Sequence, residues 1–377
     1  MKLSTLRVLT LVFIVSLIVA LASSVQLPAQ EQQKDVAGSA HHLAIITFDP
    51  PGSVFTLPFA INPAGAIAGV YVDSSGVWHG FVRAKDGTIT TFDAPGAGTG
   101  PSQGTNPLSI NPEGAITGFY RDASTVLHGF LRDRHGTFTT FDAPGAGTGS
   151  FQGTQAVSIN PKGAIAGFVF DDNNALHGYL RSPDGTITTF DAPGAGTGSF
   201  QGTDTGNICG LNPAGAIGGE FVDDNYVFHG YVRSPDGTIT PFDVPGAGAT
   251  FAGHINPAGT ISAPYTDSSG VTHGYLRTAD GAITKYDVPG AGTGSGQGTF
   301  GGCINPAGTI VGNYVDANNV NHGYVRTSKG EITKFDVPGA GTGPGQGTNP
   351  GGINPAGAIT GYYIDANNVF HGFLRIP

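Results

Sequence analysis

Charge is scarce in this chain of 377 residues: only 12% are Asp, Glu, Lys or Arg, and the net charge is −10. Proteins that bind nucleic acid present a basic face to the phosphates, so we expect no nucleic-acid partner. Cysteine is scarcer still, and with Cys209 and Cys303 alone we expect no disulfide framework to hold the fold together. Beyond the N-terminal segment no stretch has sustained helical periodicity, which argues against an α-helical fold.

Long apolar runs are also lacking, with one exception near the N-terminus. Lys2 and Arg7 precede this run and a small-x-small cleavage pattern ends it, so we predict a signal peptide over residues 1–22. Residues 23–43 are polar and aperiodic, which predicts a disordered spacer. An uncleaved membrane anchor is the alternative, because the run has about the minimum length for a span. With cleavage the mature chain has no membrane span, and we expect a secreted protein, extracellular or periplasmic.

Glycine and proline, by contrast, are abundant, with 62 and 26 copies, and they recur at fixed positions of a repeat. The pentapeptide His-Gly-aromatic-Val/Leu-Arg begins at His79, His128, His177, His229, His273, His322 and His371. The dipeptide Asn-Pro also recurs, at spacings of 49, 49, 52, 44, 49 and 49 residues. Periods of this length with short strands are typical of propellers and solenoids.

Each unit contains four predicted strands separated by turn sequences. In the first unit these strands cover residues 59–62, 66–73, 77–84 and 89–94. The last unit lacks its fourth strand, whereas the N-terminal end carries an unmatched copy, Phe48-Asp49-Pro50. A closed ring needs such a copy, because it completes the last blade and removes an exposed sheet edge. We therefore predict an all-β fold over residues 44–377, a seven-bladed β-propeller with four antiparallel strands per blade, closed by the N-terminal strand.

The turns also set a register between strands. If Lys85-Asp86-Gly87 is a three-residue hairpin loop, then His79 faces Asp93 across the third and fourth strands, 14 residues later. The corresponding pairs are His79 with Asp93, His128 with Asp142, His177 with Asp191, His229 with Asp243, His273 with Asp287, His322 with Asp336 and His371 with Asp49. A His–Asp pair is part of a hydrolytic triad, but an active site needs one pair and every unit has one. We therefore assign the pairs, and the arginine that ends each pentapeptide, to the structure of the blade.

A Gly-rich segment follows each fourth strand and lacks the Lys and the helix of a phosphate loop. We interpret it as the connection to the next unit, on the same face as the turns between second and third strands. Loops on a rigid scaffold often bind ligands, and the amides and aromatics of this face suit a sugar or a polar polymer. The candidate binding residues are Gln103, Phe151, Gln152, Phe200, Gln201, Gln297 and Gln346. A solvated polar rim is the alternative.

Turns rich in Asp and Asn lie on the same predicted face, at residues 171–174, 223–225, 316–319 and 365–368. Their side chains offer the oxygen ligands that calcium prefers. Each turn is short, however, and also fits ordinary turn chemistry. We therefore expect no cofactor, with calcium as the alternative.

Departures from the repeat single out three residues. The position before Ile/Leu-Asn-Pro is His254 and Cys303 in two neighbouring units, and Cys209 lies one position earlier in the unit before them. The three side chains could converge on the central channel as a metal or thiol site. The alternative is drift on a tightly packed strand, with cysteine as a small buried side chain, and we expect no bound metal.

The motifs His-Gly-Phe/Tyr-Val/Leu-Arg, Asp-Gly-Thr-Ile-Thr-Thr-Phe-Asp-Ala-Pro-Gly-Ala and Ile-Asn-Pro-Ala-Gly-Ala-Ile-Thr-Gly-Tyr-Tyr recur through residues 44–377. Together they resemble the bacterial "probable extracellular repeat, HAF family" proteins, although this chain has His-Gly where the family's name implies His-Ala. The resemblance implies export and a β-propeller-like repeat, and it implies no settled activity. A fainter similarity to streptogramin-lyase-type propellers implies a metal and acid/base residues in the channel, and we find no matching set.

These observations favour a secreted, monomeric, non-enzymatic module that binds a polymer such as a glycan, or a partner in the cell envelope. A propeller enzyme, a lyase or hydrolase of glycans with its chemistry near His254 and Cys303, is the alternative, and a purely structural surface module is a third. The enzyme hypothesis requires that these two side chains converge on an open channel. If they lie in the packing between blades, it loses its candidates.

Overall fold

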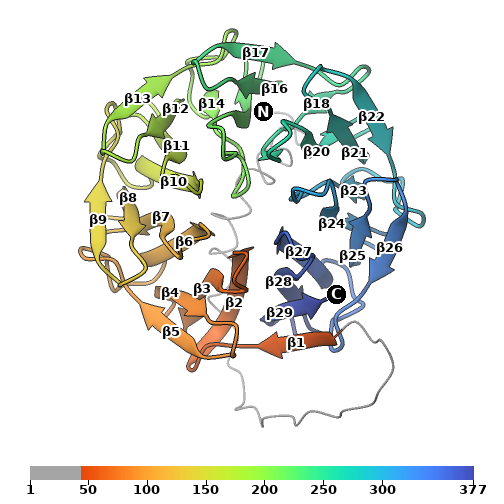
Figure 1. The fold of residues 1–377 in the computed structure, drawn as a ribbon, viewed down its shortest axis with the longest axis horizontal. Helices are drawn as coiled ribbons and strands as arrows, with labels where there is room; N and C mark the ends of the chain where they lie inside the picture. The colour runs from red at the N-terminus through yellow and green to blue at the C-terminus, as the bar shows by residue number, and fades with distance from the viewer. Residues whose placement is uncertain (1–43) are drawn as a thin grey trace. The chain divides into compact units, whose positions relative to one another are not determined.

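The structure is a computed structural model that describes residues 44–377. These residues form strands β1 to β29 and contain no helix, so the expected all-β class is confirmed (Figure 1). In this part of the chain, accordingly, no helix is long and apolar enough to span a membrane. The predicted signal peptide over residues 1–22 and the spacer over 23–43 lie outside the described residues.

Antiparallel pairing collects the strands into groups that follow the sequence repeat. Group 1 comprises β2 (Ser53–Ile61), β3 (Ile67–Asp73), β4 (Trp78–Arg83) and β5 (Ile89–Phe92). Group 2 comprises β6 (Gly104–Ile110), β7 (Ile116–Arg121), β8 (Leu127–Arg132) and β9 (Phe138–Phe141). Group 3 comprises β10 (Gly153–Ile159), β11 (Ile165–Phe170), β12 (Leu176–Arg181) and β13 (Ile187–Phe190).

The later groups depart from this pattern in their first strands. Group 4 comprises β14 (Gly202–Asp204), β15 (Ile217–Val222), β16 (Phe228–Arg233) and β17 (Ile239–Phe242). Group 5 comprises β18 (Ala249–Thr250), β19 (His254–Ile255), β20 (Ile261–Thr266), β21 (Thr272–Arg277) and β22 (Ile283–Tyr286). Group 6 comprises β23 (Gly298–Phe300), β24 (Ile310–Val315), β25 (Asn321–Arg326) and β26 (Ile332–Phe335). Group 7 comprises β27 (Gly347–Ile353), β28 (Ile359–Ile364) and β29 (Phe370–Ile376), and β29 also pairs with the N-terminal β1 (Ala44–Phe48).

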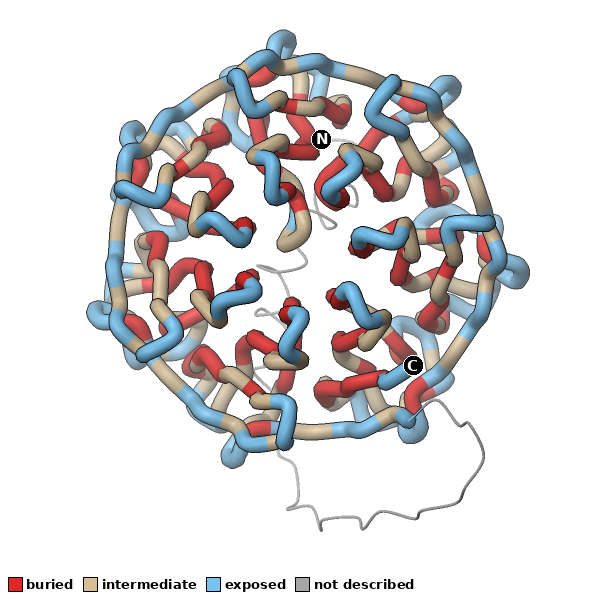
Figure 2. Tube along the Cα trace, viewed as in Figure 1, coloured by how far each residue is buried: buried red, intermediate tan, exposed pale blue. Residues whose placement is uncertain are grey.

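In groups 1 to 3 the first strand lies innermost in Figure 1 and the fourth lies outermost, and β17, β22, β26 and β1 continue the outer layer. Single parallel bridges such as Trp78↔Gly104 join neighbouring groups, so the strands form one continuous sheet. The inner strands are buried along most of their length, as in β7, whereas β5, a fourth strand, has half-buried residues at its ends and exposed residues between them (Figure 2). One core cluster contains Ala68 of group 1 and Ile116 of group 2, so the core lies between neighbouring groups.

The aromatic residue of the pentapeptide is the central core side chain of its group. All seven are fully buried, at 0% exposure: Phe81, Phe130, Tyr179, Tyr231, Tyr275, Tyr324 and Phe373. Each such burial contributes about 1.5–3 kcal/mol. The glycine before it has a separate role, because a Cβ atom on Gly80 would lie 2.5 Å from the ring of Phe92 on the neighbouring strand. The pentapeptide thus places one ring in the core and leaves room for a second.

The register predicted from the turns is found in the sheet. Tyr71 pairs with His79 and Phe81 pairs with Thr91. The first strand of group 1 is longer than predicted, since β2 begins at Ser53 and the sequence indicated only residues 59–62. Irregular pairing within β2 breaks the alternation of side chains, which concealed its first half.

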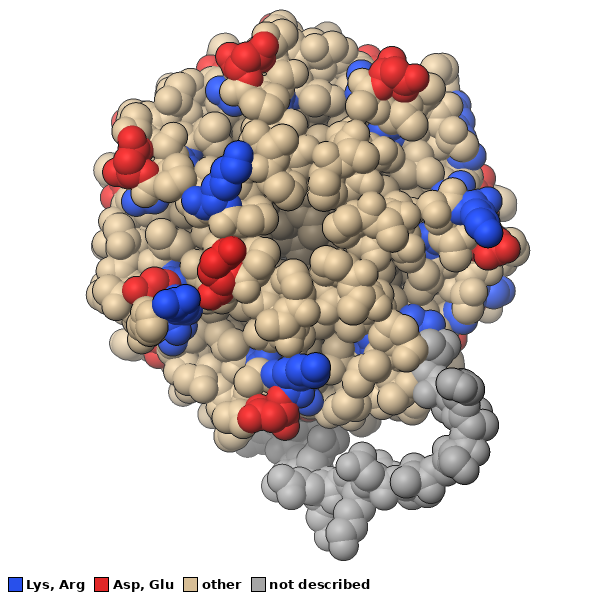
Figure 3. All heavy atoms as spheres, viewed as in Figure 1, with Lys and Arg blue, Asp and Glu red and all other residues tan. Residues whose placement is uncertain are grey.

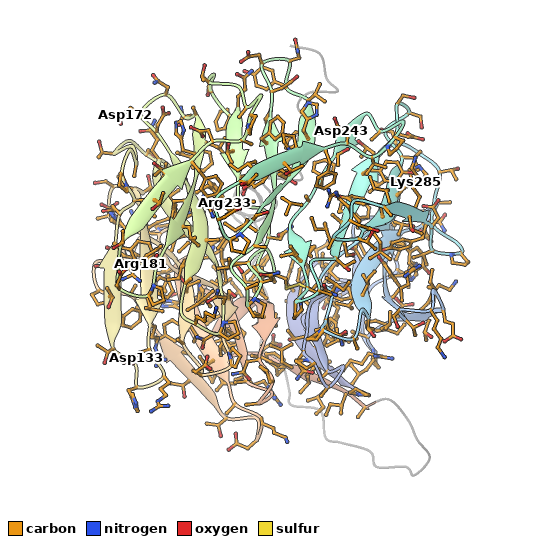
Figure 4. All side chains as sticks on the ribbon, turned by 45° about the horizontal axis from the view of Figure 1, so that its top comes forward. Asp133, Asp172, Arg181, Arg233, Asp243 and Lys285 are labelled. Carbon is orange, nitrogen blue, oxygen red and sulfur yellow. A yellow bond between two sulfur atoms is a disulfide. The ribbon has the colours of Figure 1, made fainter. Side chains whose placement is uncertain are left out.

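Successive hairpins place two kinds of turn at opposite ends of the strands. Asp172 lies in a turn between second and third strands and Asp133 in a turn between third and fourth strands; Figure 4 labels both. We call the end with the first kind the loop face. The connections between groups lie there too, because Gly98 donates a hydrogen bond to the Arg121 carbonyl at the end of β7. The face of the molecule seen in Figure 3 is hollowed at its centre and carries its charged side chains mainly towards the rim.

Candidate functional site

The structure brings together every predicted His–Asp pair, from His79–Asp93 to His371–Asp49. The distance from Nδ1 to the nearest carboxylate oxygen is 2.9–3.0 Å in six pairs and 2.7 Å in the pair His371–Asp49. The Nε2 atom faces a second carboxylate, that of the preceding turn, at 3.5–3.8 Å. Each imidazole therefore lies between two carboxylates. The same arrangement recurs in every group, so its geometry singles out no catalytic set.

His371 differs from the other motif histidines in its burial, with a side chain only 10% exposed. Burial disfavours the charged imidazolium, but the hydrogen bond and the negative charge of Asp49, with Asp365, outweigh burial and raise the pKa of His371 above 6.5. This contact joins the C-terminal strand β29 to the residue that follows β1.

The arginine that ends each pentapeptide covers an aromatic ring of the neighbouring fourth strand. The distance from Cζ to the ring centroid is 4.6–5.0 Å in all seven cases. Arg83, for example, covers Phe48 of β1, and Arg233 covers Phe190 of β13. A cation–π contact of this kind contributes about 0.5–2 kcal/mol. The repeated arginines therefore join neighbouring groups.

The Asn-Pro motif has a similar joining role. Asn62 accepts a hydrogen bond from the Ala66 amide through Oδ1 at 2.9 Å and donates through Nδ2 to the Asn111 carbonyl at 3.3 Å. The same donation links Asn111 to Asn160, Asn160 to Asn212, Asn212 to Asn256, Asn305 to Asn354 and Asn354 to Asn62. These buried amides therefore link the inner ends of neighbouring groups.

The glutamines predicted to bind a ligand are tied into the loops. Gln103 accepts a hydrogen bond from the Gly100 amide at 2.7 Å and donates to the Ala123 carbonyl of the next turn at 2.9 Å. The equivalent acceptor contact recurs at Gln152, Gln201, Gln297 and Gln346. The remaining predicted residues, Phe151 and Phe200, are 50% and 36% exposed. Of the predicted loop-face set, these aromatic side chains offer the most open surface.

The Asp/Asn turns use their carboxylates internally. Asp171 Oδ1 accepts the backbone N–H groups of Asn173 and Ala175, each at 2.8 Å, and Oδ2 faces His177. Asp223, Asp316 and Asp365 make the corresponding contacts. Calcium at these turns would compete with the backbone and with the histidine for the same oxygen atoms.

Cys209 and Cys303 form a disulfide, with Cα atoms 6.0 Å apart, whereas the sequence led us to expect no disulfide framework and to treat the two cysteines as unpaired. The three side chains do come together, since His254 Nδ1 lies 3.5 Å from Cys303 Sγ and the three ligand atoms lie within 4.8 Å of one another. The sulfur atoms of Cys209 and Cys303 are bonded to each other, so neither can serve as a thiolate nucleophile or metal ligand. Burial lowers the pKa of His254 to about 4.

An inserted segment explains why the disulfide was missed. The unit that contains Cys209 is three residues longer than most, with an Asn-Pro spacing of 52 rather than 49. The Ile208 carbonyl accepts hydrogen bonds from Ser109 Oγ at 3.3 Å and Ser158 Oγ at 3.1 Å, in groups 2 and 3. Its neighbour Cys209 is bonded to Cys303, which precedes β24 of group 6. The segment therefore reaches across the centre of the ring of strands (Figure 1).

Two buried carboxyl groups were also missed. Asp204 and Glu220 pair directly across β14 and β15, and they are 9% and 8% exposed. Burial raises the pKa of Asp204 to about 7, and burial with the nearby charge of Asp204 raises that of Glu220. Asp204 accepts the Gly206 amide at 2.9 Å and Glu220 accepts the Ala252 amide at 3.1 Å. The signal was Glu220, at a strand position that carries Val70, Phe119 and Phe168 in groups 1 to 3.

Solved structures that resemble this chain are β-propeller proteins, which confirms the expected architecture at that level. The BP39L lectin from Burkholderia pseudomallei has 11% identity and a TM-score of 0.54, over 85% of this chain and 96% of the lectin. U3-55K has 8% identity and a TM-score of 0.53, over 88% of this chain and 98% of its own. A puromycin hydrolase mutant, S511A, complexed with PGG has 12% identity and a TM-score of 0.53, over 86% of this chain and 53% of the enzyme.

This chain thus spans about half the length of the hydrolase. No family model and no curated protein sequence matches it. At these low identities the likeness concerns the fold alone, and the fold accommodates both a lectin and a hydrolase. The activity must therefore be argued from the side chains of this chain.

Proposed function

We propose that this chain is a secreted, closed, seven-bladed β-propeller whose loop face binds a polymer of the glycan class without catalysing a reaction. Each group described above is one blade, and β1 serves as the fourth strand of the last. Closure is supported by the pairing of β1 with β29, by Arg83 over Phe48 and by the hydrogen bond from Asn354 to Asn62. Elsewhere the pairing corresponds to that of third and fourth strands within a blade, and the arginine and asparagine contacts join neighbouring blades.

The observation that carries the binding function is a set of exposed aromatic side chains on strained backbone. Phe151, Phe200 and Tyr226 have φ angles of 62°, 60° and 62° and are 50%, 36% and 43% exposed. A left-handed conformation costs a residue with a side chain about 1–2 kcal/mol. Glycine, at Gly296 and Gly345, occupies the loop position of Phe151 and Phe200 in two other groups. Aromatic rings kept at the surface against this cost are typical of a binding surface.

The same observations weigh against the enzyme alternative. Cys303 is fully buried and bonded to Cys209, and His254 is 7% exposed, so the predicted catalytic candidates lie in packing. The carboxyl pair Asp204 and Glu220 has the raised pKa values found in acid/base catalysts. Both side chains are buried between strands, however, and a substrate would need an opening to reach them.

Export completes the proposal, with a signal peptide over residues 1–22, a spacer over 23–43 and the propeller over 44–377. The disulfide supports an oxidising compartment, either periplasmic or extracellular, because cytosolic proteins rarely retain one. The resemblance of the repeat motifs to the "probable extracellular repeat, HAF family" proteins implies the same location. We further propose that the mature chain is a monomer.

A glycan array tests this function. The mature protein, residues 23–377, is applied with and without added calcium to an array that includes neutral and acidic polysaccharides. We expect binding to at least one class of glycan in both conditions. The function is wrong if no glycan is bound in either condition, and binding that requires calcium would move the site to the Asp/Asn turns.

A further inference from the structure

Arg121, the last residue of β7, breaks the repeat at a buried position. Its side chain is 3% exposed. The other groups carry uncharged residues at the equivalent end of the second strand, namely Val72, Phe170, Val222, Thr266, Val315 and Ile364. The fold therefore does not require an arginine there, and the residue calls for a separate explanation.

The Arg121 guanidinium is enclosed by aromatic rings and has few polar contacts. Its Cζ lies 5.2 Å from the ring centroid of Trp78, 5.5 Å from that of Phe119 and 5.6 Å from that of Phe151. Its Nη1 donates to the Ser102 carbonyl at 3.2 Å, and its buried Nε has no hydrogen-bond partner within residues 44–377. Burial lowers its pKa to about 10, and no acidic side chain of the described chain counteracts this.

A buried cation without a counter-charge is unfavourable unless something compensates it. The rings offset part of this cost through their π faces. The rings contact the faces of the guanidinium. Its N–H donors point outwards at the edge, and no carboxylate of the described residues accepts hydrogen bonds from them. That edge fits a carboxylate, which accepts two parallel hydrogen bonds from arginine.

Phe151 is the one exposed ring around this group, since Trp78 is 4% exposed and Phe119 is fully buried. It lies in a loop whose backbone is held by a hydrogen bond from the Phe151 amide to the Thr125 carbonyl at 3.0 Å. In the next group the equivalent Phe200 packs edge-on against Phe170, at 6.4 Å between ring centroids. One aromatic loop residue thus covers a cation and its counterpart covers another ring, which makes Phe200 a matched control.

We propose that Arg121, Trp78 and Phe151 form a binding site for a carboxylate-bearing sugar of the uronate class, presented by an acidic polysaccharide. This site assignment rests on the proposed glycan-binding function and specifies the class of sugar that is bound. The Phe151 side chain turns away from the guanidinium to admit the carboxylate, which pairs with the N–H edge of Arg121. The aromatic rings then contact the apolar face of the sugar.

Trp78 makes the site directly observable, because it is the single tryptophan of the chain. Tryptophan fluorescence of the mature protein is followed during titration with glucuronate, with glucose and with glucose 6-phosphate. We expect a saturable change with glucuronate and none with glucose. A response to glucose 6-phosphate without one to glucuronate would contradict the carboxylate assignment.

Two variants test the residues. Arg121→Met removes the charge and should weaken glucuronate binding about tenfold or more. Because that change alters a buried position, Phe151→Gly is the second variant, and Gly296 and Gly345 show that this loop accepts glycine. It should weaken binding by about tenfold while its thermal midpoint stays equal or rises. Phe200→Gly, at the matched position, should leave glucuronate affinity unchanged.

The outcomes separate this site from the wider function. If acidic glycans bind on the array but glucuronate leaves the Trp78 fluorescence unchanged, the site is wrong and the glycan-binding function stands. If glucuronate binds and no glycan on the array does, the site is supported and the polymer function fails. Full affinity in both Arg121→Met and Phe151→Gly would also overturn the site.

Discussion

Replacing Asp204 with asparagine is expected to stabilise this protein at alkaline pH. Asp204 lies opposite Glu220 across β14 and β15, and both carboxyl groups are buried. Burial raises the pKa of Asp204 from 3.8 to about 7. Asparagine retains the size and an acceptor for the Gly206 amide and has no proton to lose. The variant therefore removes one titration and little else.

The direction of the effect follows from the raised pKa. Between about pH 4 and about pH 7 the folded protein holds a proton on Asp204 that the unfolded chain has released. The contribution to the free energy of unfolding is complete below about pH 4 and is lost as the pH rises through about 7. A difference of about three pKa units corresponds to on the order of 4 kcal/mol. Loss of the neighbouring charge should also lower the pKa of Glu220 and add to the gain.

The assay is urea unfolding of both proteins, with the disulfide intact, at about pH 5 and about pH 9. The raised pKa of His371 also makes the wild type lose stability as the pH rises above about 6.5, and both proteins share this term. The difference between the two proteins therefore reports the buried pair of Asp204 and Glu220. We expect the urea midpoint of Asp204→Asn, relative to that of the wild type, to rise between about pH 5 and about pH 9, because at about pH 5 only part of the contribution of Asp204 has been lost. Parallel curves for the two proteins would refute the reasoning.

Two further predictions concern the contacts that hold the ring. Asp49→Ala removes the 2.7 Å contact with His371 and should lower the free energy of unfolding by about 1 kcal/mol. Asp93→Ala should have a smaller effect, because the Asp93 side chain is 52% exposed. Equal shifts of the thermal midpoint in the two variants would contradict a special role for the contact between β29 and the end of β1. Replacing Cys209 and Cys303 together by serine should cost about 2–4 kcal/mol, because the bond closes a loop with a sequence separation of 94, and a reductant should bring the wild type to the same thermal midpoint. Equal stability with and without the bond would show that the inserted segment is held by packing alone.

The strand register was predictable because its determinants are local. The hairpin turn at residues 85–87 places Phe81 opposite Thr91 and His79 near Asp93, and every unit repeats the turn. The contact of His371 with Asp49 was predicted because the last unit lacks its fourth strand and the N-terminal end carries an unmatched copy of that strand. Because the same turn recurs in every unit, an ambiguous register in one unit can be resolved from the others.

The contacts between groups were not predictable in the same way. Arg83 was correctly assigned to the structure, but its position over Phe48 depends on how neighbouring groups pack and not on any turn. The disulfide depends on an insertion that carries Cys209 out of its strand towards Cys303. Gln103 was read as a ligand-binding side chain, whereas the loop uses both ends of its amide. Sequence periodicity indicates which residues are equivalent, but it does not indicate which side chains pack between neighbouring groups.

Glycan binding is proposed to depend on the exposed aromatic loop residues Phe151 and Phe200. The most direct test compares the wild type with the double variant Phe151→Gly, Phe200→Gly on the same glycan array, after circular dichroism shows equal folding. We predict that the wild type binds and that the double variant loses about tenfold or more in affinity for the same glycan. Undiminished binding by the double variant would contradict the claim, because the strained rings would then have no part in recognition.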